Sequence, residues 1–334
     1  MLRIPFETAH SQLAAVLRKL GVSAPRANLS ARLFAETTCD GVYSHGVNRF
    51  SRCVAMIRNG TVDPAAEPER VTAFGALERW DGRRGLGNLN AHAAMQRAIE
   101  LSRQHGIACV ALANTNHWMR GGTYGWQAVE SGVVGICFTN TMPNLPPWGG
   151  VEPVIGNNPL VLAVPRAAGA VVLDMAMSQF SYGGLEGYRR RGEALPVDGG
   201  FDANGRLTRD PAAIEQTQRL LPVGYWKGSG LAILLDSIAA MLALGNATHQ
   251  IVSEPLRETG LSQTFIAINP AGLGSSEKME SIADGIVASV RACAPAEAGR
   301  HVRTPGEQTL KLREENRALG LPIEAAVWEE ILKM

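Results

Sequence analysis

The first part of the chain, residues 6 to 58, has the hydrophobic periodicity of helices. Leu13, Leu17 and Leu20 recur at spacings of three and four residues. Two further helical patterns follow, and the apolar residues that mark them are Leu29, Leu33, Phe34, Phe50, Val54 and Ile57. We therefore expect a helical N-terminal segment that ends near Gly60, where glycine supplies a stop signal.

After residue 70 the pattern changes to short apolar runs that are typical of buried strands. They are rich in β-branched residues, are bounded by Gly, Pro or Asn, and have the sequences GIACVALAN, GVVGICFTNT, NPLVLAVP and GAVVLDMAMS. A fifth strand, SQTFIAINP, begins at Ser262. The helical patterns of this part of the chain cover Leu89 to Gln104, Tyr124 to Glu130, Gly228 to Leu244 and Thr309 to Met334.

Together these patterns predict an α/β protein. We expect a central β-rich lobe over residues 76–230, which carries the cofactor and substrate sites. We expect the helical N-terminal segment, residues 1–75, to pack with a C-terminal segment, residues 231–334. The expected architecture is a central sheet flanked by helices from both ends of the chain.

Composition narrows the class of protein. With 46% hydrophobic residues the chain has enough apolar side chains for a sizeable core, and 32 basic against 31 acidic residues argue against a nucleic-acid or polybasic membrane surface. The five cysteines form no CxxC pair, so we predict no metal site and no redox dithiol. The N-terminus has no signal-peptide pattern, and no run of 18 apolar residues occurs. We expect a cytoplasmic protein.

The segment SHGVNRF gathers Ser44, His45 and Arg49 between two helical patterns. A histidine titrates near neutrality, so His45 suits proton transfer at cellular pH. The guanidinium of Arg49 offers a fork that binds a carboxylate at two points. The two residues would share one face of a continuous helix. The alternative interpretation is a capped turn with a structural histidine and a surface arginine.

The segment NTNHWMRGGTYGW follows a predicted strand, at the kind of position where α/β proteins place ligand loops. His117 is its candidate polar group for binding substrate. A glycine-rich turn with a hydrogen-bonded histidine is the alternative. In LPVDGGFDANG, Asp198 and Asp202 are candidate carboxylates that orient His45, although Asp in a Gly/Asn loop is commonly a turn residue.

The chain contains no GxGxxG, so an ordinary Rossmann cofactor site is not supported. Three weaker candidates remain. LDMAMSQFSYGG follows an apolar strand, WKGSG opens an apolar helix, and PGEQ forms a turn. A helix start presents free N–H groups to phosphate, so we expect the N–H groups after Lys227, with its ammonium, to bind the cofactor pyrophosphate. Gly228 and Gly230 are expected to allow close backbone approach.

Taken in order, the strings GVYSHGVNRF, NHWMRGG, YGWQA, PPWG, DMxMSxFSYG, LPVDGGFD and LPxGYWKGSG resemble the type-2 malate/L-lactate dehydrogenase family over nearly the whole chain. The resemblance implies a non-Rossmann fold with a central mixed sheet, NAD(P)H as cofactor, a homodimer, and His45 as proton donor. It implies cofactor contacts by Ala170, Val171, Val172, Leu173, Asp174, Met175, Ala176, Trp226, Lys227, Gly306, Glu307 and Gln308. Commoner family members carry a segment like GWALD where this chain has GGFD, which bears on Asp202.

The resemblance implies an oxidoreductase that reduces a 2-keto or diketo sugar acid with NADH, with NADPH as the alternative cofactor. A malate, L-lactate or ureidoglycolate dehydrogenase with the same machinery is the alternative within the family. A serine hydrolase built on Ser44 and His45 is disfavoured, because no GxSxG elbow occurs. A non-catalytic protein that binds sugar acids is the alternative of another class.

Overall fold

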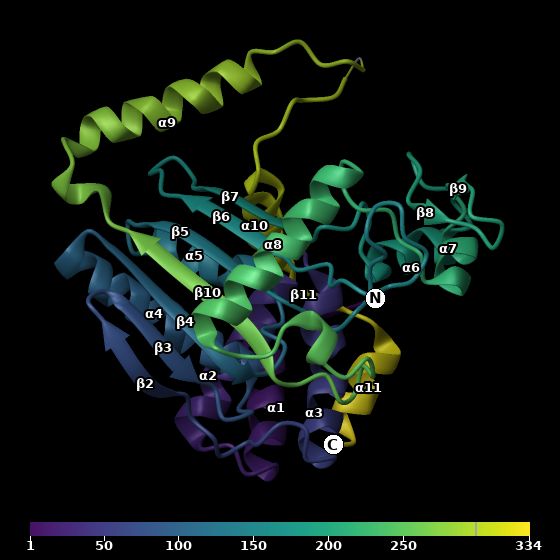
Figure 1. Ribbon diagram of the computed structural model, residues 1–334, viewed down its shortest axis with the longest axis horizontal. Helices are drawn as coiled ribbons and strands as arrows, with labels where there is room; N and C mark the ends of the chain where they lie inside the picture. Colours follow the sequence, from purple (N-terminus) through teal and green to yellow (C-terminus); the bar gives the residue numbers. More distant parts are fainter. Residues whose placement is uncertain (298) are drawn as a thin grey trace.

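A seven-stranded sheet runs through the centre of the computed structural model (Figure 1). The structure describes residues 1–297 and 299–334. The sheet order is β2-β3-β4-β10-β5-β6-β7, and every neighbouring pair is antiparallel except the parallel pair β3–β4. The strands of this sheet are β2 (Glu69–Phe74), β3 (Leu77–Asp81), β4 (Ile107–Thr115), β5 (Val134–Thr139), β6 (Leu160–Val164), β7 (Val171–Met175) and β10 (Leu261–Ile268). The predicted α/β class with a mixed central sheet is confirmed.

Helices cover both faces of the sheet, because the apolar side chains of β10 alternate between the two faces. Phe265 packs in one cluster with residues of α4 (Gly87–His105) and α5 (Gly122–Glu130). Its neighbour Ile266 packs on the other side, against the cluster that contains Leu235 of α8 (Trp226–Ala243). These three helices confirm the sequence predictions to within two residues at each end.

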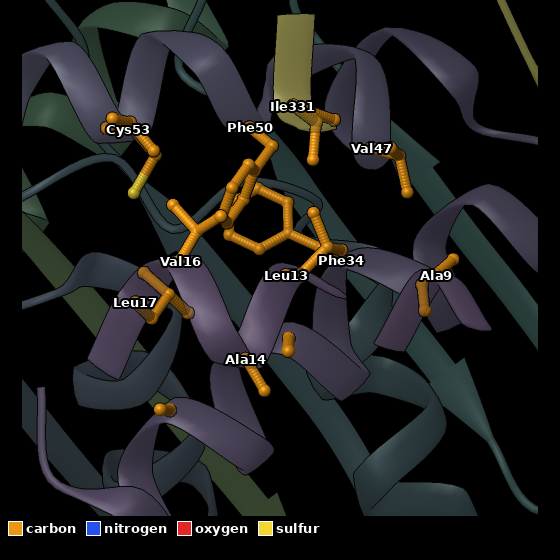
Figure 2. Close-up of a cluster of buried hydrophobic side chains, with 14 of the residues drawn as sticks. Ala9, Leu13, Ala14, Val16, Leu17, Phe34, Val47, Phe50, Cys53 and Ile331 are labelled. Carbon is orange, nitrogen blue, oxygen red and sulfur yellow. The ribbon is translucent and has the colours of Figure 1, made fainter. Parts of the chain in front are cut away.

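The two ends of the chain pack together beside the sheet. Their elements are β1 (Leu2–Ile4), α1 (Phe6–Lys19), α2 (Ala24–Cys39), α3 (Phe50–Arg58), α10 (Glu307–Leu319), β11 (Leu321–Ile323) and α11 (Ala325–Leu332). β1 pairs antiparallel with β11, and one apolar cluster joins residues of the N-terminal helices to Trp328 and Ile331. Figure 2 shows part of this cluster, in which the rings of Phe34 and Phe50 meet edge to face at 5.3 Å.

Several elements differ from the sequence predictions. The C-terminal segment is not one helix, because α10 ends at Gly320, which has a φ of +90°, and β11 with Pro322 follows. The patterns also missed β2, which is exposed at all six positions and therefore shows no alternation. Other elements that were not predicted are β1, β3, α6 (Tyr182–Arg191), β8 (Gly200–Phe201), β9 (Leu207–Thr208), α7 (Pro211–Thr217) and α9 (Ser276–Arg291).

The sheet takes strands from all three predicted segments of the chain. β2 belongs to residues 1–75, and β10, at the centre of the sheet, belongs to residues 231–334. The predicted segment boundaries near residues 75 and 230 therefore do not separate the sheet from the helical segments. α9 lies apart from the sheet at the margin of the molecule (Figure 1) and is joined to the β6–β7 turn by an ion pair of Arg166 with Asp284 at 2.6 Å.

Within the described residues, α8 is the one helix that is long and apolar enough to cross a membrane by length and composition alone. The sequence analysis did not single it out as such. It packs against β10, β4 and β5, and a third of the helix is buried. The core helix of a soluble protein passes the same test, so the length and composition of α8 are weak evidence for a membrane span.

Candidate active site

His45 lies in a broken turn that follows α2. Two short 3₁₀ helices, η1 (Tyr43–His45) and η2 (Val47–Arg49), are separated by Gly46, whose backbone is not helical (φ −91°, ψ −136°). His45 and Arg49 therefore do not share the face of one continuous helix. Gly46 is required here because a Cβ at this position would lie 2.1 Å from the Thr38 hydroxyl oxygen.

The N-terminal core holds this turn in place. Val47 and Phe50 are fully buried in the cluster of Figure 2, and the Thr38 hydroxyl accepts a hydrogen bond of 2.8 Å from the Val47 N–H. Burying a side chain of this size contributes about 2 kcal/mol. Val47 and Phe50 thus anchor the backbone next to His45 and Arg49 in the core. The side chains of His45 and Arg49 themselves are only partly buried.

The structure brings His45 and His117 together. Their rings stack with centroids 5.7 Å apart and planes inclined by 24°. The Ser44 hydroxyl lies 2.9 Å from Nδ1 of His45, and this is its hydrogen-bond partner. Burial, together with the guanidinium groups of Arg49, Arg120 and Arg52, lowers the pKa of His45 to about 4.

His117 has a defined role for one of its ring nitrogens. Nδ1 accepts a hydrogen bond of 3.0 Å from the Met119 N–H, so it carries no proton and the neutral ring has its proton on Nε2. Burial, with Arg49 and His45 nearby, lowers the pKa of His117 well below its ordinary value. At neutral pH His117 is therefore a hydrogen-bond donor without charge.

Arg49 is the cation of this region without a carboxylate partner among the residues that the structure describes. Its neighbour Arg52 is paired at 3.2 Å with Glu258, which is only 3% exposed. Burial, with Arg52 beside it, lowers the pKa of Arg49 to about 10, so it stays protonated near neutrality. An anionic ligand would supply the missing negative charge.

Contacts between distant segments close the rim around His45. A Cβ on Gly183, in α6, would lie 3.0 Å from Cβ of Ser44, so α6 begins directly against the histidine turn. The Met142 N–H donates to Glu258 at 3.3 Å, which links the segment after β5 to Arg52. These contacts, with that of the Tyr182 hydroxyl to the Asn144 carbonyl, link residues 142–144, 182–183 and 258 to the segment that carries His45.

Asp198 and Asp202 are not brought to His45 within this chain. Oδ1 of Asp202 accepts the N–H groups of Asn204 and Arg206, both at 2.9 Å, which makes it a turn-forming residue of the β8–β9 hairpin. Asp198 is paired with Arg209 at 3.5 Å. The prediction that one of them orients the imidazole is not supported, because Ser44 holds Nδ1 and no carboxylate influences the pKa of His45.

Two of the predicted cofactor segments meet in the structure. The Val172 N–H donates to the Pro305 carbonyl at 3.2 Å, so Ala170–Ala176 and Gly306–Gln308 lie side by side. Gly306 has a φ of +90°, and a Cβ there would lie 3.1 Å from N of Val172. β7 is an edge strand, and the backbone groups along its open side are available to a ligand except where Pro305 takes one.

The side-chain oxygens of Glu307 and Gln308 have partners within the protein. Glu307 accepts the N–H and hydroxyl of Thr304 at 3.2 Å and pairs with Arg291 of α9 at 3.3 Å, and the Gln308 oxygen accepts from Arg303 at 2.8 Å. The side-chain nitrogen of Gln308 has no such partner among the described residues and could contact a ligand, as could the backbone of the turn.

The third segment, Trp226 and Lys227, opens α8 and is exposed. The N–H groups of Lys227 and Gly228 donate to the carbonyls of Gly224 and Val223 at 3.2 and 2.9 Å. The sequence analysis expected these N–H groups to be free for phosphate, and this expectation is wrong. The Lys227 ammonium is the donor that remains. A Cβ on Gly228 would lie 2.2 Å from the Val223 oxygen, so glycine is needed there for packing within the chain, whereas Gly230 has open space; the expected approach of a phosphate to these two glycines stays a prediction.

Sequence reasoning missed Arg52 and Arg120 as neighbours of His45. Arg120 lies in a segment that had been singled out, three residues after His117, whereas Arg52 lies two residues beyond the segment SHGVNRF. Their charges are read from the sequence, but which arginine turns toward His45 depends on pairing with Glu258 and Asp40, which lie far away along the chain.

Comparison with known proteins shows the family to which the chain belongs. The family model described as malate/L-lactate dehydrogenase matches residues 4–332. A 2,3-diketo-L-gulonate reductase from Salmonella schwarzengrund is 47% identical over 334 residues and covers 99% of both chains, as does one from Citrobacter koseri. The solved structure of sulfolactate dehydrogenase from Methanocaldococcus jannaschii matches with a TM-score of 0.92 at 27% identity, over 99% of this chain and 96% of that chain.

Proposed function

The chain belongs to the malate/L-lactate dehydrogenase family and is an oxidoreductase that acts on a hydroxy or keto acid, and we propose that it reduces 2,3-diketo-L-gulonate to 3-keto-L-gulonate with NADH. The observation that carries this proposal is the stacked pair His45–His117 beside the unpaired Arg49. The substrate follows from the relatives that are 47% identical over the full chain.

The residues of this chain fit a nicotinamide cofactor. The open edge of β7 offers backbone donors and acceptors to an amide or a sugar, and Gly306, with a φ of +90°, lets the PGEQ turn pack closely against that strand. The exposed ammonium of Lys227 offers a charge to the phosphates. When bound, the cofactor supplies the hydride that reduces the keto carbon. This arrangement supports a non-Rossmann mode of cofactor binding, since no GxGxxG is present.

The proposed roles of the side chains follow from their positions. Arg49 binds the carboxylate of the substrate, and His117 donates a hydrogen bond from Nε2. His45 donates the proton that the reduced carbonyl oxygen requires and recovers it from solvent. Ser44 orients the imidazole through its contact with Nδ1. Asp198 and Asp202 take no part in this scheme, because their carboxylates are bound elsewhere in the chain.

A homodimer is part of the proposal. The outer face of α8 exposes a row of large apolar side chains, which are Leu231, Ile233, Leu234, Ile238, Met241 and Leu244. Such a surface favours burial against a second protein surface, and a second copy is the simplest partner. A cytoplasmic location is supported by the five cysteines, all of which are free thiols.

The test is a panel of 2-keto acids and diketo sugar acids, with the loss of NADH or NADPH absorbance as the readout. We expect the highest kcat/KM with 2,3-diketo-L-gulonate and NADH. Highest kcat/KM with pyruvate, oxaloacetate or the oxidised form of ureidoglycolate would assign the chain to another activity of the family. Binding of sugar acids without oxidation of either cofactor would show a non-catalytic binding protein.

A further inference from the structure

Arg120 is a buried arginine that the proposed reaction does not use. It lies in the segment between β4 and α5, and its side chain is only 4% exposed. Its Nε is buried without a hydrogen-bond partner, which is rare and costly for a guanidinium. A charge kept in such a place calls for an explanation.

Two carboxylates from distant elements hold this arginine. Asp40, the C-cap residue of α2, makes a very close ion pair with Nη1 of Arg120. Asp40 is also bound by Arg313 of α10, with contacts of 2.6 and 2.8 Å. Because Asp40 precedes the histidine turn by only a few residues, the same pair ties Arg120 to the backbone that carries His45.

The second carboxylate belongs to the proposed cofactor strand. Oδ2 of Asp174, in β7, lies 3.8 Å from Nε of Arg120 and accepts a hydrogen bond of 2.7 Å from the Gly122 N–H. Gly122 is the first residue of α5, so Asp174 caps that helix from the sheet. Arg120 thus lies between the strand proposed for the cofactor and the turn that carries the proton donor.

We propose that Arg120 is a positioning residue that acts through His45. Its charge affects how readily His45 is protonated, and its pairs with Asp40 and Asp174 link the turn that carries His45 to β7. The proposal rests on the proposed function, in which His45 transfers the proton. Removing the positive charge of Arg120 makes His45 easier to protonate. Removing the negative charge of Asp174 leaves Arg120 less neutralised and makes His45 harder to protonate.

The charges that face His45 support this sign. Burial is the largest cause of its lowered pKa, and Arg49 of η2, Arg120 and Arg52 of α3 lower it further. His117, the other titratable group against the ring, stays neutral because its own pKa is well below the ordinary value. Glu258 neutralises Arg52, whereas Asp40 and Asp174 neutralise Arg120. A change at Arg120 or Asp174 therefore alters the charge balance without removing a group that touches the substrate.

The decisive experiment is an NMR measurement of the His45 imidazole in the full-length protein. His45→Gln identifies its signal among the seven histidines. The ratio of protonated to neutral ring is measured at one pH, close to the midpoint of the wild-type titration. We expect Arg120→Gln to raise this ratio about tenfold, the effect of one nearby charge, and Asp174→Asn to lower it. Arg120→Lys keeps the charge and should stay near the wild-type ratio.

Opposite shifts are the signature of the proposed role, because a merely structural defect has no reason to move the two variants in opposite directions. Equal ratios, or shifts of the same sign in both variants, would overturn it. If Arg120→Gln does not fold, as judged by circular dichroism, Asp174→Asn and Arg120→Lys decide the matter alone. The ratio does not depend on turnover, so an inactive substrate panel would sink the proposed function and leave this result to be judged separately.

The same variants have an expected effect in the enzyme assay. The limb of log kcat against pH should move to higher pH in Arg120→Gln and to lower pH in Asp174→Asn, while KM for the keto acid changes less than kcat. A loss of activity with no movement of the limb in either variant would contradict the positioning role.

Discussion

The imidazole rings of His45 and His117 stack 5.7 Å apart, although along the chain His45 precedes the first strand of the central sheet and His117 follows β4. Two positive charges at that distance would repel by about 3 kcal/mol at an effective dielectric constant near 20. The pair therefore carries at most one charge near neutrality. Protonation of His117 would break the hydrogen bond that its Nδ1 accepts from the backbone, so in the proposed mechanism His45 is the member that gains and donates the proton.

Replacing His45 by alanine should lower turnover by roughly 10²–10⁴ and leave NADH affinity within a few-fold, because a general acid acts only in the chemical step. Stopped-flow turnover and NADH fluorescence titration measure the two quantities. His105→Ala, an exposed histidine at the end of α4, is the matched control and should behave like the wild type. Unchanged turnover in His45→Ala would remove His45 from the mechanism.

The pH dependence of the reaction should differ between its two directions. His45 must be protonated to donate, and its pKa is about 4, so kcat/KM for reduction should fall about tenfold per pH unit above that value. In the oxidation of the hydroxy acid the neutral imidazole accepts the proton, so kcat/KM should be level over the same range. Initial rates of both directions, measured at several pH values between about 5 and 8, test this prediction. A reduction rate that rises with pH would refute it.

Lys227→Met should weaken NADH binding and reduce the dependence of that binding on ionic strength, because the variant loses the ammonium that we propose binds the phosphates. The affinity for the keto acid should change less. Lys19→Met, on the exposed end of α1, is the control for removing a surface lysine. A Lys227→Met protein with wild-type NADH affinity and salt dependence would leave the phosphate site unlocated.

Two glycines of α8 should respond in opposite ways to alanine. In Gly228→Ala the new Cβ would lie 2.2 Å from the Val223 carbonyl oxygen, so the free energy of unfolding should fall by more than about 1 kcal/mol. Gly230 has open space, and Gly230→Ala should stabilise the helix by about 0.4–1 kcal/mol. Urea unfolding of both variants gives the comparison, and equal midpoints would contradict it.

Light scattering should give the mass of a dimer at micromolar concentration. Leu234→Glu places a charge on the exposed apolar face of α8 and should shift the protein toward the monomer. Phe74→Glu, on the edge strand β2, is the control and should keep the wild-type mass. A wild-type protein that is monomeric would refute the dimer.

The sequence by itself determined the elements that have continuous apolar patterns and the segments that bear the chemistry. α4, α8 and β10 were predicted closely, because a buried helix face or a strand buried on both faces leaves its period in the sequence. β2 left no such record, since all its side chains are exposed. His45, Arg49 and His117 were identified by residue type and local setting.

Tertiary structure alone decided which of these segments meet. The apolar pattern of β10 predicts a strand but cannot say that it pairs between β4 and β5, because the backbone groups that form a sheet are the same in every residue. An aspartate in a glycine-rich loop has the same local signature whether it caps a turn, as Asp202 does, or orients a histidine. Arg120 became a neighbour of His45 only because Asp40 and Asp174, from separate elements, hold its charge there.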